Sequence, residues 1–284
     1  MRFGINTFLW TANFGKEHID LFPRIKEWGF DGVEIGCFNF REFPAREVRR
    51  ALESNGLGAT VCSALIGSQS LATDDATIRQ QTSEHIRNGI RMVGELGAST
   101  FAGPFCSAVG YLPGRRRTDE EWQRAIDGIR ELTPALDDAK VTLAVEPLNR
   151  FETFFLNTQA DARSLCDAVN HPRVGVLFDT FHANIEEKSM AAGCEALGPY
   201  IKHVHTCEND RGTPGSGHIE WTEVFSSLKK AGYDDWLVIE TFGSRIKEIA
   251  AAACIWRDLA PVSEDIASEG VKFLRLQAKL AAAG

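Results

Sequence analysis

Several features that mark broad classes of protein are missing from this sequence. None of its seven cysteines forms a CxxC pair, and the odd number of cysteines, mostly with apolar neighbours, favours a reduced intracellular protein over a disulfide-stabilised one. No apolar run reaches the roughly 20 residues of a transmembrane helix. The N-terminus enters a strand-like pattern without a signal peptide. We therefore expect a cytoplasmic protein with no membrane partner.

An excess of positive charge is also missing. Lys and Arg together number 31 against 39 Asp and Glu, which gives a formal net charge of -8 at pH 7. The one tight basic run, residues 115–117, is typical of a solvated loop. The acidic balance counts against a nucleic-acid partner. The acidic balance and the small number of histidines, seven, also count against a metal-dependent nuclease, which needs a basic groove and several histidine ligands.

Strand-like and helix-like segments alternate along the whole chain. The strand-like runs cover residues 2–10, 32–36, 58–64, 99–103, 141–146, 174–179, 200–205 and 236–240. Each run and the helix-like segment after it span roughly 30 to 35 residues, the size of one βαβ repeat. Continuous apolar strands between helices indicate a parallel sheet that is covered on its faces. Eight such units predict a single-domain α/β protein over residues 1–284, a (β/α)8 TIM barrel.

The alternative architecture is an open, doubly wound sheet. That fold would need a glycine-rich phosphate-binding turn after the first strand, and residues 7–13 do not form one. Three of the predicted helical segments are long, covering residues 74–96, 118–138 and about 246–280. The second of them begins with a capping box that extends from Thr118 to Glu121.

Four strand-like runs in the C-terminal half each end in a residue that can bind a metal ion. These residues are Glu146, Asp179, His205 and Glu240. The C-terminal strand ends of a (β/α)8 barrel converge on one face, so we expect these side chains to meet. Three carboxylates and one imidazole suit a hard or borderline divalent cation better than zinc. His203 points to the same strand face as His205 and is an alternative ligand.

The segments that follow these strand ends carry a second set of polar residues. They read Glu146-Pro-Leu-Asn-Arg-Phe-Glu152, Asp179-Thr-Phe-His182, His205-Thr-Cys-Glu-Asn-Asp-Arg211 and Glu240-Thr-Phe-Gly243. Taken together, they resemble the ketose 3-epimerases, the D-tagatose and D-psicose 3-epimerase group of the xylose-isomerase-like TIM barrels. The resemblance covers nearly the whole chain and is strongest from Val141 to Gly243.

The resemblance implies a role for individual residues. It makes Glu146, Asp179, His205 and Glu240 the ligands of Mn2+, with Co2+ or Mg2+ as alternatives, and it makes Glu146 and Glu240 the catalytic acid–base pair. It matches Glu152, His182 and Arg211 with the positions that bind the O1 and O2 end of the sugar, and it makes Phe8, Trp10 and Phe105 candidates for the rest of the pocket. It also implies a homodimer or a homotetramer.

The predicted function is that of an isomerase acting on a small sugar. Inverting C3 of a ketose through a cis-enediolate needs a cation to stabilise the developing charge and two carboxylates to move the proton. An aldose–ketose isomerase such as hydroxypyruvate isomerase is the first alternative, and a non-catalytic sugar-binding protein is another. Three of the residues also have structural alternatives: His182 as a helix cap, Arg211 as a surface residue and Glu152 as an ordinary loop carboxylate.

Overall fold

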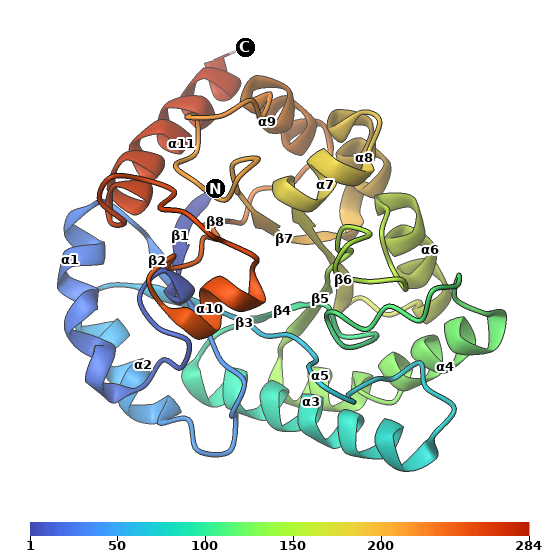
Figure 1. Cartoon of the computed structure of the whole chain (residues 1–284). Helices are drawn as coiled ribbons and strands as arrows, with labels where there is room; N and C mark the ends of the chain where they lie inside the picture. The colour runs from blue at the N-terminus through green and yellow to red at the C-terminus, as the bar shows by residue number, and fades with distance from the viewer. Residues whose placement is uncertain (284) are drawn as a thin grey trace.

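Eight parallel strands pair in chain order and close on themselves (Figure 1). The structure is a computed structural model that describes residues 1–283. The strands are β1 (Arg2–Asn6), β2 (Gly32–Gly36), β3 (Gly58–Cys62), β4 (Thr100–Gly103), β5 (Thr142–Val145), β6 (Val174–Asp179), β7 (Ile201–His205) and β8 (Trp236–Ile239). The predicted single (β/α)8 barrel is confirmed.

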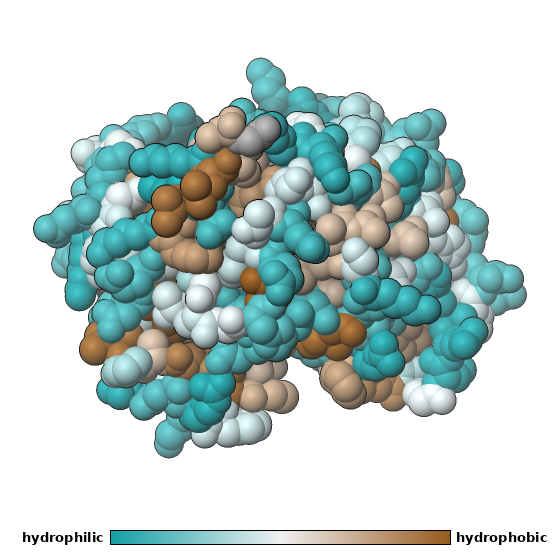
Figure 2. Space-filling view, turned by 90° about the horizontal axis from the view of Figure 1, so that it is seen from above, coloured by the Kyte–Doolittle hydropathy of each residue, from teal (hydrophilic) through white to brown (hydrophobic). Residues whose placement is uncertain are grey.

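Helices surround the barrel, most of them on its outside (Figure 1). They are α1 (Phe22–Glu27), α2 (Ala45–Ser54), α3 (Ala76–Leu96), α4 (Asp119–Arg130), α5 (Thr133–Ala139), α6 (Gln159–Val169), α7 (Thr180–Glu186), α8 (Met190–Leu197), α9 (Trp221–Lys230), α10 (Lys247–Ala252) and α11 (Asp265–Ala283). The apolar faces of most of these helices share one large buried cluster with the strands, while Ile249 of α10 belongs to a smaller cluster with Phe8 and Cys62. The face in Figure 2 is mostly hydrophilic, with hydrophobic residues in a few separate groups. Among residues 1–283, no helix is both long and apolar enough to cross a bilayer.

Local sequence signals fix where several helices begin and end. Asp75 caps α3 by accepting hydrogen bonds from the backbone of Thr77 and Ile78, and α3 ends at Gly97, which has a φ of 82°. The predicted capping box between Thr118 and Glu121 is present at the start of α4. The helix expected over residues 118–138 is divided into α4 and α5, because Pro134 lies in the first turn of α5 and has no N–H to continue the earlier ladder.

The first strand and the C-terminal helical segment also differ from the prediction. The first strand ends at Asn6 instead of Trp10, because the Asn6 side chain accepts a hydrogen bond from the Phe8 backbone and caps a 3-10 helix, η1 (Thr7–Leu9). The long C-terminal helical segment is two helices, α10 and α11, with Cys254 in the left-handed region and Pro261 between them. Figure 1 shows α10 over the end of the barrel and α11 outside it.

The interior of the barrel is filled in layers. At the N-terminal ends of the strands, the ring of Trp236 fills the space beside Gly32, where a Cβ would lie 2.4 Å from the ring. The next layer towards the C-terminal ends is polar and contains Glu34, with Asn6 and Thr60 as its register neighbours. The predicted metal ligands stand above this layer, at the C-terminal strand ends.

Thiol reactivity gives a direct test of this packing. All seven cysteines are free, and six are buried while Cys254 is exposed. Burial raises the pKa of Cys37, Cys106, Cys166 and Cys194 to about 12, which keeps these thiols protonated. We expect a thiol reagent to label the folded protein once, at Cys254, and the Cys254→Ser variant to lose this fast reaction. Rapid labelling of several thiols in the folded protein would contradict the packing.

Candidate active site

The four predicted metal ligands meet at the C-terminal end of the barrel. Asp179 and His205 are the last residues of β6 and β7, and Glu146 and Glu240 directly follow β5 and β8. One ligand atom from each side chain lies within 4.8 Å of the others, and all four residues are buried. The convergence of parallel strands therefore brings together residues that are far apart in the sequence.

Two buried atoms of this cluster lack the partner that a bound cation would supply. His205 Nδ1 and Glu146 Oε1 are buried without a hydrogen-bond partner within residues 1–283, and an unpaired buried polar atom is costly. The Nδ1 atom faces Asp179 Oδ2 at 3.5 Å and Glu240 Oε2 at 3.4 Å. Burial raises the pKa of Glu146 well above its ordinary value, and the charge of Glu240 raises it further. A divalent cation among the three carboxylates and the imidazole would coordinate the unpaired atoms and offset the repulsion between the buried carboxylates.

Arg211 is a buried partner of the cluster rather than a surface residue. Its Nη1 donates to Asp179 Oδ2 at 2.9 Å and also contacts Glu240 Oε2. The residue has a φ of 66°, and Thr241 Oγ1 secures this conformation by donating to its carbonyl at 2.6 Å. Burial alone would raise the pKa of Asp179, but Arg211 and His182 hold it well below its ordinary value. The guanidinium therefore neutralises part of the cluster's charge.

His182 lies directly beside the cluster, and Asn149 joins Glu152 to His182. The Nδ1 atom of His182 accepts the Asn149 backbone N–H at 3.0 Å, while its Nε2 lies 3.1 Å from Arg211 Nη2 and 3.7 Å from Glu146 Oε1. The Asn149 side chain donates to Glu152 at 2.7 Å. Burial lowers the pKa of His182 to about 3, so its ring is neutral near pH 7.

A cavity of about 300 Å³ opens beside these polar residues. Its remaining walls are largely apolar and include Phe8, Phe38, Ile66, Val109, Phe242 and Ile249. Phe8 stacks on Phe38 and Phe242 with ring centroids 5.7 and 5.8 Å apart. The ring of Trp10 instead stacks on Trp28 at 6.2 Å, outside the cavity, and Phe105 packs on Phe101 in the core. Of the three predicted aromatic residues, the structure brings Phe8 to the cavity.

Comparisons with known proteins give the same picture of the whole chain. A sequence model of the xylose isomerase-like TIM barrel matches residues 22–277. The chain belongs to this family. It is 36% identical over 275 residues to a probable ketose 3-epimerase from Synechocystis sp., and the match covers 97% of this chain and 96% of that protein. The predicted place among the ketose 3-epimerases, a group of isomerases, is therefore confirmed.

Solved structures extend this similarity to three dimensions. The structure of an L-ribulose 3-epimerase matches with a TM-score of 0.94 at 26% identity, covering 99% of this chain and 96% of that one. A D-allulose 3-epimerase from Methylomonas sp., in complex with D-allulose, matches with a TM-score of 0.92 at 25% identity, covering 98% and 97% of the two chains. This member of the family thus shares its entire barrel with proteins that bear epimerase names.

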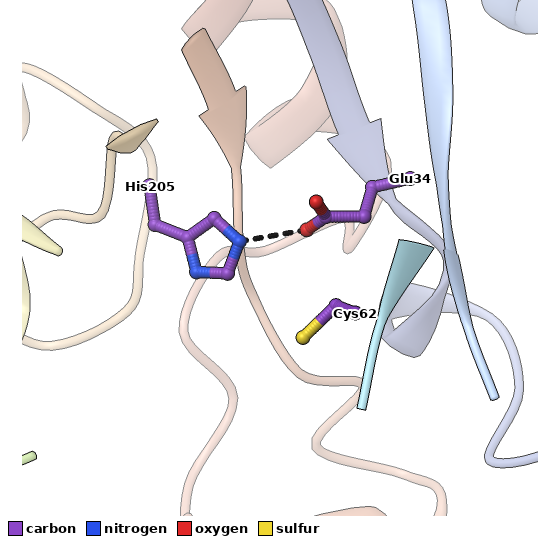
Figure 3. Close-up of side chains that lie close together, drawn as sticks. All are labelled: Glu34, Cys62 and His205. Atoms are coloured by element: carbon purple, nitrogen blue, oxygen red, sulfur yellow. Dashed lines mark hydrogen bonds and ion pairs between the residues drawn. The ribbon is translucent and has the colours of Figure 1, made fainter. Parts of the chain in front are cut away.

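Sequence reasoning missed Glu34, a carboxylate that contacts the cluster. It is fully buried in β2, and it lies 2.7 Å from His205 Nε2 and 2.6 Å from His203 Nε2. Figure 3 shows its carboxylate directed at the His205 ring. The sequence does contain a signal for this residue, because Glu34 is the single carboxylate within the apolar strand Gly32–Gly36. Both histidines contact Glu34, but His205 is the one in the four-ligand cluster.

Glu208 is a second buried carboxylate that sequence reasoning did not select. Its side chain accepts hydrogen bonds from the backbone of Gly215 at 2.7 Å and of Ile219 at 3.0 Å, and from Trp221 Nε1 at 3.0 Å. It thereby anchors the loop between β7 and α9. Since this loop also carries Arg211, Glu208 helps to hold one wall of the site in place.

Proposed function

We propose that this protein is a metal-dependent epimerase that inverts C3 of a ketose through a cis-enediolate. The observation that carries the proposal is the pair of buried carboxylates, Glu146 and Glu240, which line one cavity beside the four-ligand cluster. The relatives support it, since one is named a probable ketose 3-epimerase and the D-allulose 3-epimerase was solved with its sugar.

The reaction needs two groups that exchange protons with C3 on opposite faces of the sugar. A C–H next to a carbonyl is a weak acid, and a bound divalent cation supplies Lewis-acid stabilisation of the charge that develops on the neighbouring oxygens. Glu146 and Glu240 directly follow β5 and β8, on different sides of the barrel end. One glutamate removes the proton as general base while the other returns one as general acid, and the roles exchange in the reverse direction.

The proposal places a divalent cation within the four-residue cluster. Glu146, Asp179, His205 and Glu240 would hold it, and their oxygen-rich set suits Mn2+, Co2+ or Mg2+. The resemblance to the epimerases favours Mn2+. Metal content of the purified protein, measured before any metal is added, identifies the ion that is bound.

The polar end of the cavity provides the groups that orient the sugar. We assign Glu152, His182 and Arg211 to the O1 and O2 end, since all three line the cavity next to Glu146. His182 is neutral and can exchange hydrogen bonds with a hydroxyl without adding charge. Arg211 adds positive charge where negative charge develops on the substrate. Phe8 contributes a wall at the apolar end.

The walls also limit the class of substrate. Among the residues that line the cavity within the described chain, Arg211 is the single Lys or Arg, and its guanidinium is engaged by Asp179 and Glu240. The distal walls of Phe38, Ile66, Val109 and Ile249 supply no charge for a phosphate. The proposed substrate is therefore a free ketose whose far end is selected by shape.

A ketose panel tests the proposed function. Metal-loaded protein would be incubated with D-tagatose, D-psicose and L-ribulose, and the products separated by chromatography. We expect the 3-epimer of at least one ketose. Formation of an aldose would instead support the alternative of an aldose–ketose isomerase, and binding without conversion would support a sugar-binding protein. The homodimer or homotetramer and the cytoplasmic location stay predictions, and light scattering would measure the former.

A further inference from the structure

Glu34 connects strands across the interior of the barrel. Its Oε1 accepts from Asn6 Nδ2 at 3.0 Å and lies 2.7 Å from His205 Nε2. Its Oε2 accepts from Thr60 Oγ1 at 2.9 Å and lies 2.6 Å from His203 Nε2. The partners come from β1, β3 and β7, and β7 is not adjacent to β2 in the sheet. One buried side chain therefore fixes residues on both sides of the barrel.

These contacts determine which nitrogen of His205 is available. An ionised carboxylate is a hydrogen-bond acceptor and cannot donate, so the Nε2 atoms of both histidines must carry the hydrogens that they share with Glu34. A neutral His205 then has its free lone pair on Nδ1. Nδ1 is the atom that faces Asp179 and Glu240, at 3.5 and 3.4 Å. Both the tautomer and the direction of the ring match the ligand cluster.

A different role for Glu34 is that of a metal ligand. Ligand atoms of Glu34, Cys62 and His205 lie within 4.8 Å of one another, a spacing that would suit an ion. Figure 3 shows the thiol of Cys62 beside the carboxylate, while the dashed line joins Glu34 to the ring. Each Glu34 oxygen already has two partners, and the Nε2 atom of His205 is one of them. A cation at this position would have to break those contacts, so the geometry favours a supporting role.

We propose that Glu34 is a positioning residue of the metal centre. Its carboxylate holds the Nε2–H of His205, so that Nδ1 faces the cation. The inference rests on the proposed metal-dependent function. Carboxylates that hold the second nitrogen of a ligating histidine are a general device for fixing ring orientation and raising ligand basicity. Here one carboxylate holds two histidines, and only His205 stands in the four-ligand cluster.

The Glu34→Gln variant tests the proposal through metal affinity. A Gln side chain has one acceptor oxygen, and its NH2 group would face the Nε2–H of one of the two histidines. We expect the affinity for Mn2+, measured by titration calorimetry, to fall by about 10- to 100-fold. The matched control is Thr60→Val, which removes one contact of Glu34 and leaves both histidine contacts, and its Mn2+ affinity should stay close to that of the wild type.

The calorimetric outcomes separate this inference from the proposed function. If the wild type binds Mn2+ and Glu34→Gln binds it equally well, the positioning role is wrong while the proposed function stands. If the wild type binds no divalent cation, the proposed metal dependence fails and the positioning role fails with it. A loss of affinity in Glu34→Gln alone, with Thr60→Val unaffected, supports both.

A second measurement needs no variant of Glu34. Wild-type protein with 15N-labelled histidine rings would be loaded with Mg2+, and the His205 signals assigned by their loss in His205→Gln. We expect Nε2 to retain its hydrogen and the Nδ1 resonance to shift when Mg2+ binds. Coordination through Nε2, or a hydrogen on Nδ1 in the loaded protein, would overturn the proposal whether or not the Glu34 variant folds.

Discussion

Replacing either Glu146 or Glu240 by Gln is expected to abolish epimerisation. A Gln amide cannot exchange a proton with C3, and the loss of general acid–base catalysis alone costs about 10²- to 10⁴-fold in rate. Each substitution also removes one anionic oxygen ligand from the four-residue cluster. In the proposed mechanism, each glutamate acts as base in one direction and as acid in the other, so both variants should lose the forward and the reverse reaction.

Turnover of the two variants would be measured by chromatography on the best ketose of the panel, with Mn2+ in excess. Glu121→Gln provides a matched control, because Glu121 is also a buried carboxylate but pairs with Arg115 outside the cavity. It should fold with lower stability and keep its turnover. Near wild-type turnover in Glu146→Gln or Glu240→Gln, with metal bound, would show that the assigned acid–base role is incorrect.

Removing the divalent cation is expected to have the second largest effect. Chelation should reduce epimerisation to the background rate, and Mn2+ should restore it. A cation that binds the folded cluster should also stabilise the fold, by about 2.7 kcal/mol at 100 times its dissociation constant. The Tm of the chelated protein should therefore rise as Mn2+ is added, a readout that does not depend on turnover.

The Asp179→Asn variant separates the cation's effect from that of the chelator. Asp179 caps α7 through the backbone N–H groups of Phe181 and His182, and Asn can serve as a cap as well. The variant should therefore fold but lose most of the Mn2+-dependent rise in Tm. Asp137→Asn, at an exposed carboxylate paired with Arg173, should keep the whole rise. Full turnover after verified removal of metal would refute metal dependence.

The barrel and the ligand cluster could be predicted because both depend on regular, local patterns. Apolar strands repeat between helices, and the closed parallel sheet places the ends of β5 to β8 side by side. Residues at those ends, such as Asp179 and His205, are therefore neighbours in space whatever the loops between them do. That regularity is why four single positions sufficed to locate the cluster.

Glu34 could not be predicted in the same way. It lies in the middle of β2, and its histidine partners are 169 and 171 residues away in the sequence. Nothing local distinguishes it from a strand carboxylate that pairs with a base. Its role depends on the side chain crossing the barrel interior to β7, which is a property of the assembled sheet rather than of any segment.

The first βα loop shows how a local turn can redirect a side chain. A strand that continued to Trp10 would place Phe8 and Trp10 on one face, by the two-residue period. The capping bond from the Phe8 backbone to Asn6 instead starts η1 and ends the strand. Phe8 then reaches the cavity while Trp10 packs on Trp28. The C-terminal segment also misled the prediction. Its helix-forming residues continue between α10 and α11, where the chain is irregular.

The central claim is that protons move at C3 of the sugar, between two glutamates. Its most direct test is to run the wild-type reaction in D2O with Mn2+ and locate the incorporated deuterium by NMR. The account predicts one deuterium at C3 of the product, unlabelled C1, and no incorporation after chelation. Deuterium at C1 together with formation of an aldose, or epimerisation without any exchange at C3, would contradict it.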